Sequence, residues 1–333
     1  MNMKKIYILW GLLACMALFT SCYEEDTLTP TEGGIELRFK VPQGNNSWDD
    51  DIAQIYEDYN VYLIYKDLQR ADFNRSWTGI SYGSGYEGQG CVNDEMTNYY
   101  VEFMKKHIFA YLNPPITSKV LPMYWYLGYN VYSKSVLEVG GVILASWIVP
   151  IHENYDGLDY WCTCMFGEDN PSDPYLIPTD RALLDRRRKM ILEKAVKAGN
   201  IIIPEEFEVG FDHVTNLIAG LGMEDDPNYY LTRGYPGSVN TYVFNSISEP
   251  ANNSYPPTNE ETFIGYMHLS MYYNQARLAE VYPADKYPFL TEKFAFVQKY
   301  LKDKYQIDLE AIANGPEDWD LPLPPIPETP DEE

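Results

Sequence analysis

The hydrophobic pattern of the sequence changes near its middle, and this change limits the folds that the chain can adopt. Residues 120–132 and 136–149 are rich in aromatic and β-branched side chains, which are typical of β-strands. Beyond residue 180, apolar residues instead recur at three- and four-residue spacing, which predicts helices over 180–198, 208–221, 259–281 and 286–305. A sheet-forming half followed by a mostly helical half predicts the α+β fold class.

The N-terminal half is itself mixed. The pattern predicts a short helix over residues 50–59 and a strand over 61–65. Residues 79–90 are rich in glycine and are expected to form a loop. A helix is expected over 92–112, with Asn93 or Asp94 as its N-cap. This half should therefore hold a small sheet together with helices.

The first residues predict export. Lys4 and Lys5 precede an apolar run over residues 6–19 that is too short for a membrane span. Small residues stand directly before Cys22, as a lipoprotein signal peptidase requires. We therefore expect removal of residues 1–21 and lipidation of Cys22. The alternative is an ordinary secretory signal with an incidental cysteine.

The remaining chain divides by composition. We expect a tether over residues 22–45, one domain over 46–313, and an acidic, proline-rich tail over 314–333 that is flexible or loosely docked. The acidic cluster at 23–26 resembles the surface-export signal of Bacteroidota lipoproteins. That resemblance implies a lipid-anchored protein of the outer membrane that faces the cell exterior.

Net charge excludes some partners. The formal charge is −24, and removal of Lys4 and Lys5 with the signal would make it −26. A chain this acidic is repelled by nucleic acids and by anionic lipid surfaces, so we expect no nucleic-acid partner. Membrane attachment is expected through the lipid on Cys22 alone.

Three cysteines remain after export and lipidation. In an oxidising compartment, Cys91 could pair with Cys162 or with Cys164, and the sequence leaves this pairing open. Cys162 and Cys164 could also form half of a metal site. They have no second cysteine or histidine pair at a useful spacing, so we do not expect one.

Two glycine-rich motifs and one histidine motif are interpreted as chance matches. Residues 79–83 match G-x-S-x-G and residues 83–88 match G-x-G-x-x-G, but no helix follows directly, as either site would require. Residues 152–156 read His-Glu-x-x-Asp in a segment predicted to be a turn. Metal ligands four residues apart converge only on a helix.

Residues 210–222, GFDHVTNLIAGLG, have the spacing of polar and apolar residues that is typical of a metallopeptidase active-site helix. On a helix, Asp212 and Asn216 would lie one turn apart on one face, where two zinc-binding histidines stand in such enzymes. His213 would take the place of the catalytic glutamate. Asparagine is a poor zinc ligand, so a polar helix face is the simpler interpretation.

The chain resembles the Bacteroidota family of substrate-import-associated zinc metallohydrolase lipoproteins over most of residues 45–313. The similar stretches are DDIAQIYEDYNVYLIYK, GGVILASWIVPI and FVQKYLKDKYQIDLEAI. The resemblance implies a metallopeptidase-like fold with a His-Glu-x-x-His helix and a third ligand on a later acidic helix. Here Asp212, His213 and Asn216 replace the first motif, and Gly265 stands at the third-ligand position. The resemblance thus implies a degenerate site with no bound zinc or other cofactor, and no catalytic residue is assigned.

Three functions follow as hypotheses. The first is an inactive accessory or ligand-binding lipoprotein of a TonB-dependent nutrient importer and its surface lipoproteins, with a peptide or glycan ligand. Thirty tyrosines and seven tryptophans would suit stacking on sugars, and residues 123–129, MYWYLGY, are the first candidate surface.

The second hypothesis is an active hydrolase. It would use either a rearranged metal site or an acid/base pair drawn from Glu205, Glu206, Glu208 and Asp212. The third is a scaffold that docks on the importer.

Overall fold

The computed structural model describes residues 37–75, 84–169, 174–175, 181–239, 247–314 and 319–326. The chain divides into two units, Met1–Lys40 and Val41–Glu333. Only residues 37–40 of the first unit are described, and Cys22 and the motif at 79–83 lie outside the described residues. All that follows concerns the second unit.

Helices and strands have the following bounds. The helical elements are α2 (Ser47–Tyr59), α3 (Arg70–Phe73), α4 (Asp94–Phe103), the π-helix η1 (Met104–Ile108), the 3₁₀ turn η2 (Phe109–Tyr111), α5 (Pro114–Thr117), α6 (Arg181–Lys197), α7 (Glu205–Glu208), α8 (Asn259–Tyr272), α9 (Gln275–Val281), α10 (Pro288–Tyr305) and α11 (Leu309–Ala313). The strands are β1 (Tyr62–Ile64), β2 (Gly85–Gly90), β3 (Tyr124–Val139), β4 (Val142–Pro150), β5 (Glu153–Asp156), β6 (Tyr160–Phe166), β7 (Ser238–Val239) and β8 (Ile247–Ser248). The predicted α+β class is confirmed.

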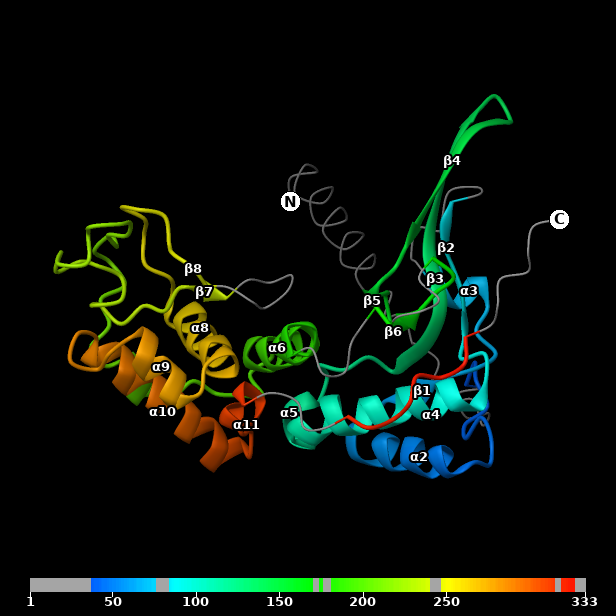
Figure 1. Cartoon of the computed structure of the whole chain (residues 1–333), viewed down its shortest axis with the longest axis horizontal. Coiled ribbons are helices and arrows are strands. Elements are labelled where there is room, and N and C mark those ends of the chain that lie inside the picture. The colour runs from blue at the N-terminus through cyan, green and yellow to red at the C-terminus, as the bar shows by residue number, and fades with distance from the viewer. Residues whose placement is uncertain are drawn as a thin grey trace, which may run out of the picture. The chain divides into compact units, whose positions relative to one another are not determined.

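Strand β3 organises a mixed six-stranded sheet. It pairs in parallel with β1 and with β6, and antiparallel with β2 and with β4. Strand β5 completes the sheet as the antiparallel neighbour of β6. Figure 1 shows β3 and β4 rising together beyond the other strands.

The strand predictions over 120–149 are right in type and wrong in their division. The chain turns at Gly140 and Gly141, which lie inside the second predicted strand. Both have positive φ, +63° and +84°, as the tight turns of β-hairpins require. The two strands therefore form one long hairpin. The expected loop over 79–90 is also wrong in part, because residues 85–90 form β2.

The aromatic segment 123–129 lies in the core and not on a ligand surface. Its rings Tyr124, Trp125, Tyr126 and Tyr129 are all buried. Tyr126 stacks on Tyr160 of β6, with ring centroids 4.5 Å apart. The interpretation of this segment as a stacking surface is therefore wrong, since β3 is covered on both faces here.

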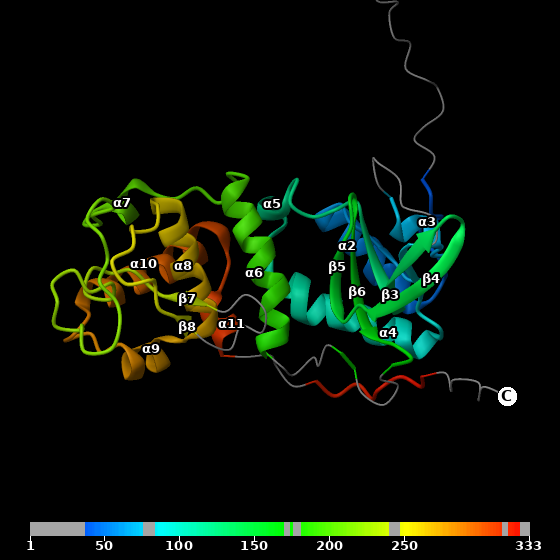
Figure 2. The ribbon, with the colours of Figure 1, turned by 90° about the horizontal axis from the view of Figure 1, so that it is seen from above.

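Helix α6 joins the sheet to the C-terminal helices. It contacts α5 and η1 on the side of the sheet, and α8 on the other side. Figure 2 shows α6 running between these two parts. Helix α8 also packs against α10 and α11. The helix predicted over 259–281 is two helices, because the chain is extended at Tyr273 before Asn274 caps α9.

The three described cysteines are free thiols, so neither of the disulfides left open by the sequence is present. Cys162 and Cys164 are fully buried on β6. Burial raises the pKa of Cys91 and that of Cys164 to about 12. Thiols with such a raised pKa are poor nucleophiles and poor metal ligands at neutral pH.

Part of the C-terminal tail contacts the domain. Asn93 caps α4 by accepting a hydrogen bond from the Met96 amide, as predicted, and its side chain also donates to the carbonyl of Pro325. The Trp319 ring packs against Tyr99 and His107. This contact covers the π-helix η1.

None of the helices in the described ranges combines the length and the apolar character that a membrane crossing would need.

We expect His107 to make the fold sensitive to acid. It is 2% exposed, and burial first, then Arg188 and Lys106, lower its pKa from 6.5 to about 4. Between these values the unfolded chain binds a proton that the folded chain does not, so stability falls as pH falls from 6.5 to about 4. The loss is on the order of 3 kcal/mol at most.

Urea unfolding at a series of pH values measures this slope. His107→Leu should reduce it to the part that the buried His268 contributes, whereas Val209→Ala, at an exposed apolar position, should leave it unchanged. An unchanged slope in the His107→Leu variant would contradict the assignment.

Candidate functional site

Helix α6 carries buried cations toward the sheet. Arg187 is 4% exposed and forms an ion pair with Asp156 of β5 at 2.7 Å. Its guanidinium also lies 4.7 Å from the ring centroid of Trp161 and 5.3 Å from that of Trp125. A buried charge is tolerated only when it is paired and hydrogen-bonded. These contacts therefore fix the position and rotation of α6.

Beside α6 the surface is hollowed into a cleft with two adjoining parts. The larger part, about 610 Å³, lies between α6, α8 and the segment 235–239. The smaller part, about 420 Å³, lies between α6 and β5. Both parts are lined by Lys189 and Glu193. We call the two parts together the α6 cleft.

The polar groups of the α6 cleft form a connected set. Glu193 pairs with Lys197 at 2.6 Å, and His268 of α8 lies 3.8 Å from the Glu193 carboxylate. The Lys189 ammonium donates to the carbonyl of Val239 at 3.3 Å. Glu261 completes the set at the start of α8.

The charge states of this set follow from its surroundings. Burial lowers the pKa of His268 well below 6.5, and the nearby Lys189 and Lys197 lower it further, so the imidazole is neutral at pH 7. Hydrogen bonding to Glu193 raises the pKa of Lys197. Burial lowers the pKa of Lys189, and Glu193 opposes that effect.

The rest of the cleft wall is rigid and partly aromatic. It includes Tyr235, Tyr255 and four prolines: Pro236, Pro250, Pro256 and Pro257. The Tyr255 side chain is 83% exposed. Gly265 of α8 opens onto the same space, and a Cβ there would lie 3.2 Å from Pro236. A side chain at Gly265 would therefore press against Pro236 and narrow the cleft.

The helix predicted over 208–221 is wrong. Helix α7 ends at Glu208, and Gly210 has a φ of +93°. The buried Lys293 of α10 donates to the carbonyls of Glu206 and Phe207, at 3.3 and 2.8 Å. These carbonyls would otherwise accept from the next helical turn. Two of the expected apolar positions are exposed, at 82% for Val214 and 98% for Leu221, whereas Phe207 and Leu217 are buried.

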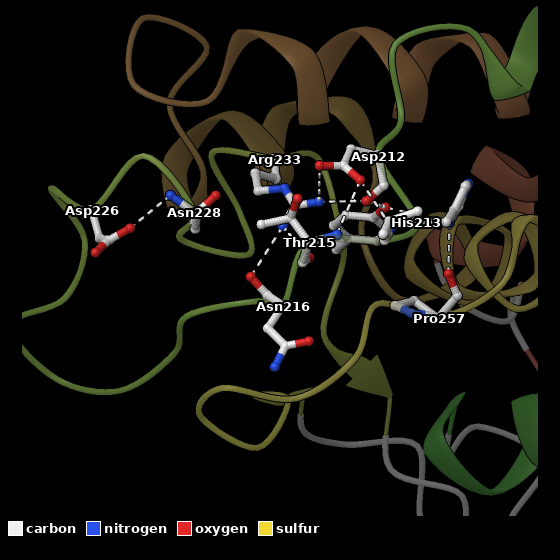
Figure 3. Close-up of polar contacts among 10 residues, drawn as sticks. Asp212, His213, Thr215, Asn216, Asp226, Asn228, Arg233 and Pro257 are labelled. Carbon is white, nitrogen blue, oxygen red and sulfur yellow. Dashed lines mark hydrogen bonds and ion pairs between the residues drawn. The ribbon is translucent and has the colours of Figure 1, made fainter.

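Arg233 holds the following segment as a loop. Its guanidinium donates to the carbonyls of Asp212, Thr215 and Asn216, and it lies 3.3 Å from the Asp212 carboxylate (Figure 3). The Asp212 carboxylate also accepts from the amides of Val214 and Thr215. Hydrogen bonds, chiefly within this turn, lower the pKa of Asp212 to about 2. Asp212 is therefore part of a turn and not of a helix face.

His213 and Asn216 are directed elsewhere. The His213 Nδ1–H donates to the carbonyl of Pro257 at 2.7 Å. The Asn216 amide donates to the carbonyl of Asn253 at 3.1 Å, and Figure 3 shows it pointing away from Asp212. The loop thus lies behind the cleft wall, because Pro257 lines the larger part of the α6 cleft.

The residues present do not fit a zinc ion. Asp212 is engaged by Arg233, Asn216 points away, and Gly265 offers no donor atom. Within the described ranges, no group of three or more His, Cys, Asp or Glu side chains is placed to hold a metal. A single imidazole at His213 is not a zinc site, since protein zinc sites use three or four ligands.

Other predicted candidates are also dispersed. Residues 153–156 form strand β5, and His152 pairs with Asp169 at 3.0 Å. Glu205, Glu206 and Glu208 are exposed on α7, away from the residues that line the cleft. They therefore do not form an acid/base pair in the cleft.

Sequence reasoning missed the residues that line the cleft. Lys189, Glu193 and Lys197 are spaced by four on a predicted helix, a pattern that usually indicates a solvated face. His268 stands in no recognisable motif of the sequence. The available signal was that the same predicted helix carries four consecutive basic residues at 186–189, more than a solvated face needs.

The chain has no match among protein families or curated proteins and a distant match among solved structures. A solved structure that matches is that of a "putative zinc-binding metallo-peptidase" from Bacteroides caccae, with 13% identity and a TM-score of 0.40. The match covers 80% of this chain and 88% of that one. A likeness this distant says nothing of metal binding or activity in this chain.

We expect the protein to hold no stoichiometric zinc. The test is elemental mass spectrometry of the chain from residue 23 onward, which includes the whole unit Val41–Glu333, purified without chelator. An Asp212→Ala/His213→Ala variant serves as the comparison. Near-stoichiometric zinc that is lost in the variant would contradict the geometry described above.

Proposed function

We propose that this protein is a lipid-anchored lipoprotein of the outer-membrane surface that binds a peptide or glycan in its α6 cleft without cleaving it. In this proposal it serves as an accessory component of a TonB-dependent nutrient importer. The observation that carries the proposal is a preformed cleft whose charged side chains are already engaged by other groups of the protein.

The anchor is supported by the sequence. Lys4 and Lys5, the apolar run over 6–19 and the small residues before Cys22 form the pattern of a lipoprotein signal. The acidic cluster at 23–26 supports export to the surface. A lipid anchor and an external face would bring the α6 cleft to nutrients outside the cell.

Ligand binding is supported by the size and the lining of the cleft. Its larger part, about 610 Å³, falls within the range of small-ligand sites, roughly 300–1,000 Å³. The prolines of the cleft wall lose little conformational entropy when a ligand binds, and this favours high affinity. The exposed Tyr255 ring can stack on a sugar or an apolar side chain, and Lys189 and Lys197 can donate hydrogen bonds.

The absence of turnover is supported by the state of the carboxylates. Hydrolysis by a carboxyl pair needs one acid with a raised pKa. Glu261 has the reverse, because hydrogen bonds from the Thr258 amide and hydroxyl lower its pKa. Glu193 is paired with Lys197. The α6 cleft is thus suited to hold a polar ligand rather than to protonate a leaving group.

Filling the cleft should abolish binding. The test screens tri- to hexapeptides and oligosaccharides against the chain from residue 23 onward by calorimetry. Any ligand found should bind Gly265→Leu at least about tenfold more weakly, and Gly265→Ala less severely, because the added side chain occupies the cleft. Lys299→Ala, an exposed change on α10, is the control and should bind normally.

Two results would contradict the cleft as a binding site: no ligand in either panel, or equal binding by Gly265→Leu with an unchanged Tm. Mass spectrometry of each bound ligand after incubation checks turnover. Time-dependent cleavage products would favour the hydrolase hypothesis instead.

Cys22→Ala should release the protein from the membrane. The full chain, expressed in a bacterium with an outer membrane and labelled with a palmitate analogue, should carry label and sediment with membranes. Cys22→Ala should lose both, whereas Cys91→Ala should keep both. Protease treatment of intact cells tests surface exposure, which replacement of Glu24, Glu25 and Asp26 by alanine should abolish. Label retained in Cys22→Ala would exclude this anchor.

A further inference from the structure

The hairpin formed by β3 and β4 extends beyond the rest of the sheet. Strand β2 begins at Gly85, opposite Lys134 of β3, and the Ser84 hydroxyl accepts from the amide of Val136. Past that point, β3 and β4 pair only with each other in the described part of the chain, up to the turn at Gly140 and Gly141. Figure 1 shows this end of the hairpin standing clear of the labelled helices.

The surface of this hairpin is apolar and almost uncharged. Glu138 is the only charged residue in 135–150. Eight large apolar side chains are 47–61% exposed: Leu137, Val139, Val142, Ile143, Leu144, Trp147, Ile148 and Val149. Summed over both faces of the hairpin, they offer on the order of 800 Å² of apolar surface, so each face carries about as much as the largest apolar patch of a typical monomer. This sum is about one partner's share of a standard protein interface, and pairing at the edge of the hairpin would bury part of it.

Apolar side chains occupy both faces of the hairpin. Ser135 pairs with Trp147 and Ser133 with Val149, which places Trp147 and Val149 on one face. Lys134 pairs with Ile148, which places Ile148 on the other. A two-stranded hairpin is at best marginally stable in water without a covered face. The hairpin therefore gains stability if a further strand and its side chains are added.

The outer edge of β4 is open to such an addition. In the described residues β4 has β3 as its sole strand neighbour. Natural edge strands are usually protected by charged residues or by proline. Residues 142–149 contain neither, and Pro150 stands at the far end of the strand. The N–H and C=O groups of this edge can thus pair with another strand.

We propose that the occupant is a second copy of this chain, with β4 pairing antiparallel to β4 of its partner about a two-fold axis. Such an interface uses the same surface on both copies, so that surface must be complementary to itself. An uncharged strand meets this condition, because no like charges come face to face. Glu138 lies on β3, which would be the outer strand of each hairpin.

A lipid bilayer fits this hairpin less well. Unpaired backbone groups along the β4 edge would enter hydrocarbon without hydrogen-bond partners, at a cost of several kcal/mol each. A second β4 strand satisfies these groups and also packs its apolar side chains beside those of the first strand. The formal charge of −26 on each copy without the signal opposes association, so dimerisation should strengthen as salt screens that repulsion.

Sedimentation equilibrium of the chain from residue 23 onward tests this proposal. We expect a reversible dimer at micromolar concentrations that tightens between about 50 and 500 mM salt. Ile143→Lys/Ile148→Lys should weaken it about 100-fold or more, because it places like charges in the interface. Val209→Lys/Leu221→Lys, at exposed apolar positions elsewhere, should leave it unchanged.

A single cysteine tests the geometry. Full overlap of two β4 strands places Ser146, the middle residue of Val142–Pro150, opposite its copy. Facing residues of antiparallel strands have Cα atoms about 4.5–5.5 Å apart, within the reach of a disulfide. Ser146→Cys should therefore form a disulfide dimer on mild oxidation, and the wild type should not.

Several outcomes would overturn the proposal. A monomer at about 50 µM in high salt would exclude a stable interface. A dimer that survives Ile143→Lys/Ile148→Lys, or that is not cross-linked through Ser146→Cys, would place the contact elsewhere. A monomer that floats with phosphatidylethanolamine vesicles through this hairpin would favour lipid as the occupant. None of these results depends on ligand binding in the α6 cleft.

Discussion

The buried cations of α6 are the constraint on which the rest of the structure depends. Arg187 is held by Asp156 and by the rings of Trp125 and Trp161, and Arg188 lies 4.6 Å from the ring centroid of Tyr111. Loss of Asp156, which is itself partly exposed, leaves the buried Arg187 without its carboxylate partner, at a cost of about 1–3 kcal/mol. The helix cannot rotate or slide without that loss. Its opposite face, with Lys189 and Glu193, is therefore presented at a fixed position to the cleft.

A cleft whose wall is fixed in this way is better suited to ligand binding than to catalysis. Glu193 and Lys197 neutralise each other, Lys189 and Glu261 are engaged by Val239 and Thr258, and the buried imidazole of His268 is neutral. A ligand can exchange hydrogen bonds with such a set without any group changing its charge. Catalysis by a carboxyl pair would instead need two groups with strongly different proton affinities. The loop of Asp212–Asn216 adds nothing to the cleft, because Arg233 and Pro257 already use its polar groups.

Sequence patterns predicted the elements that local forces determine. The long helices, the strand composition of 120–149 and the N-cap at Asn93 all depend on neighbouring residues. The helix over 208–221 failed because the deciding contacts come from Lys293 and Arg233, far away in the chain. The hairpin turn was misplaced because two glycines were counted as part of an apolar run. The cleft was missed because Lys189, Glu193 and Lys197 have the spacing of a solvent-exposed helix face. The packing of α8 beside that face depends on the tertiary structure and cannot be predicted from the spacing.

The structure buries the cation Arg187 and exposes the aliphatic side chains of the hairpin. In each case the neighbouring groups determine the result. Inside, aromatic rings and Asp156 compensate the charge of Arg187. At the hairpin, no layer of the described structure covers the strands, although their residues have the composition of a buried sheet. Solvent gives such a surface no compensation. The β4 strand has the composition of an interior strand but lies at an edge of the sheet. An identical strand can pair with that edge without placing like charges against each other.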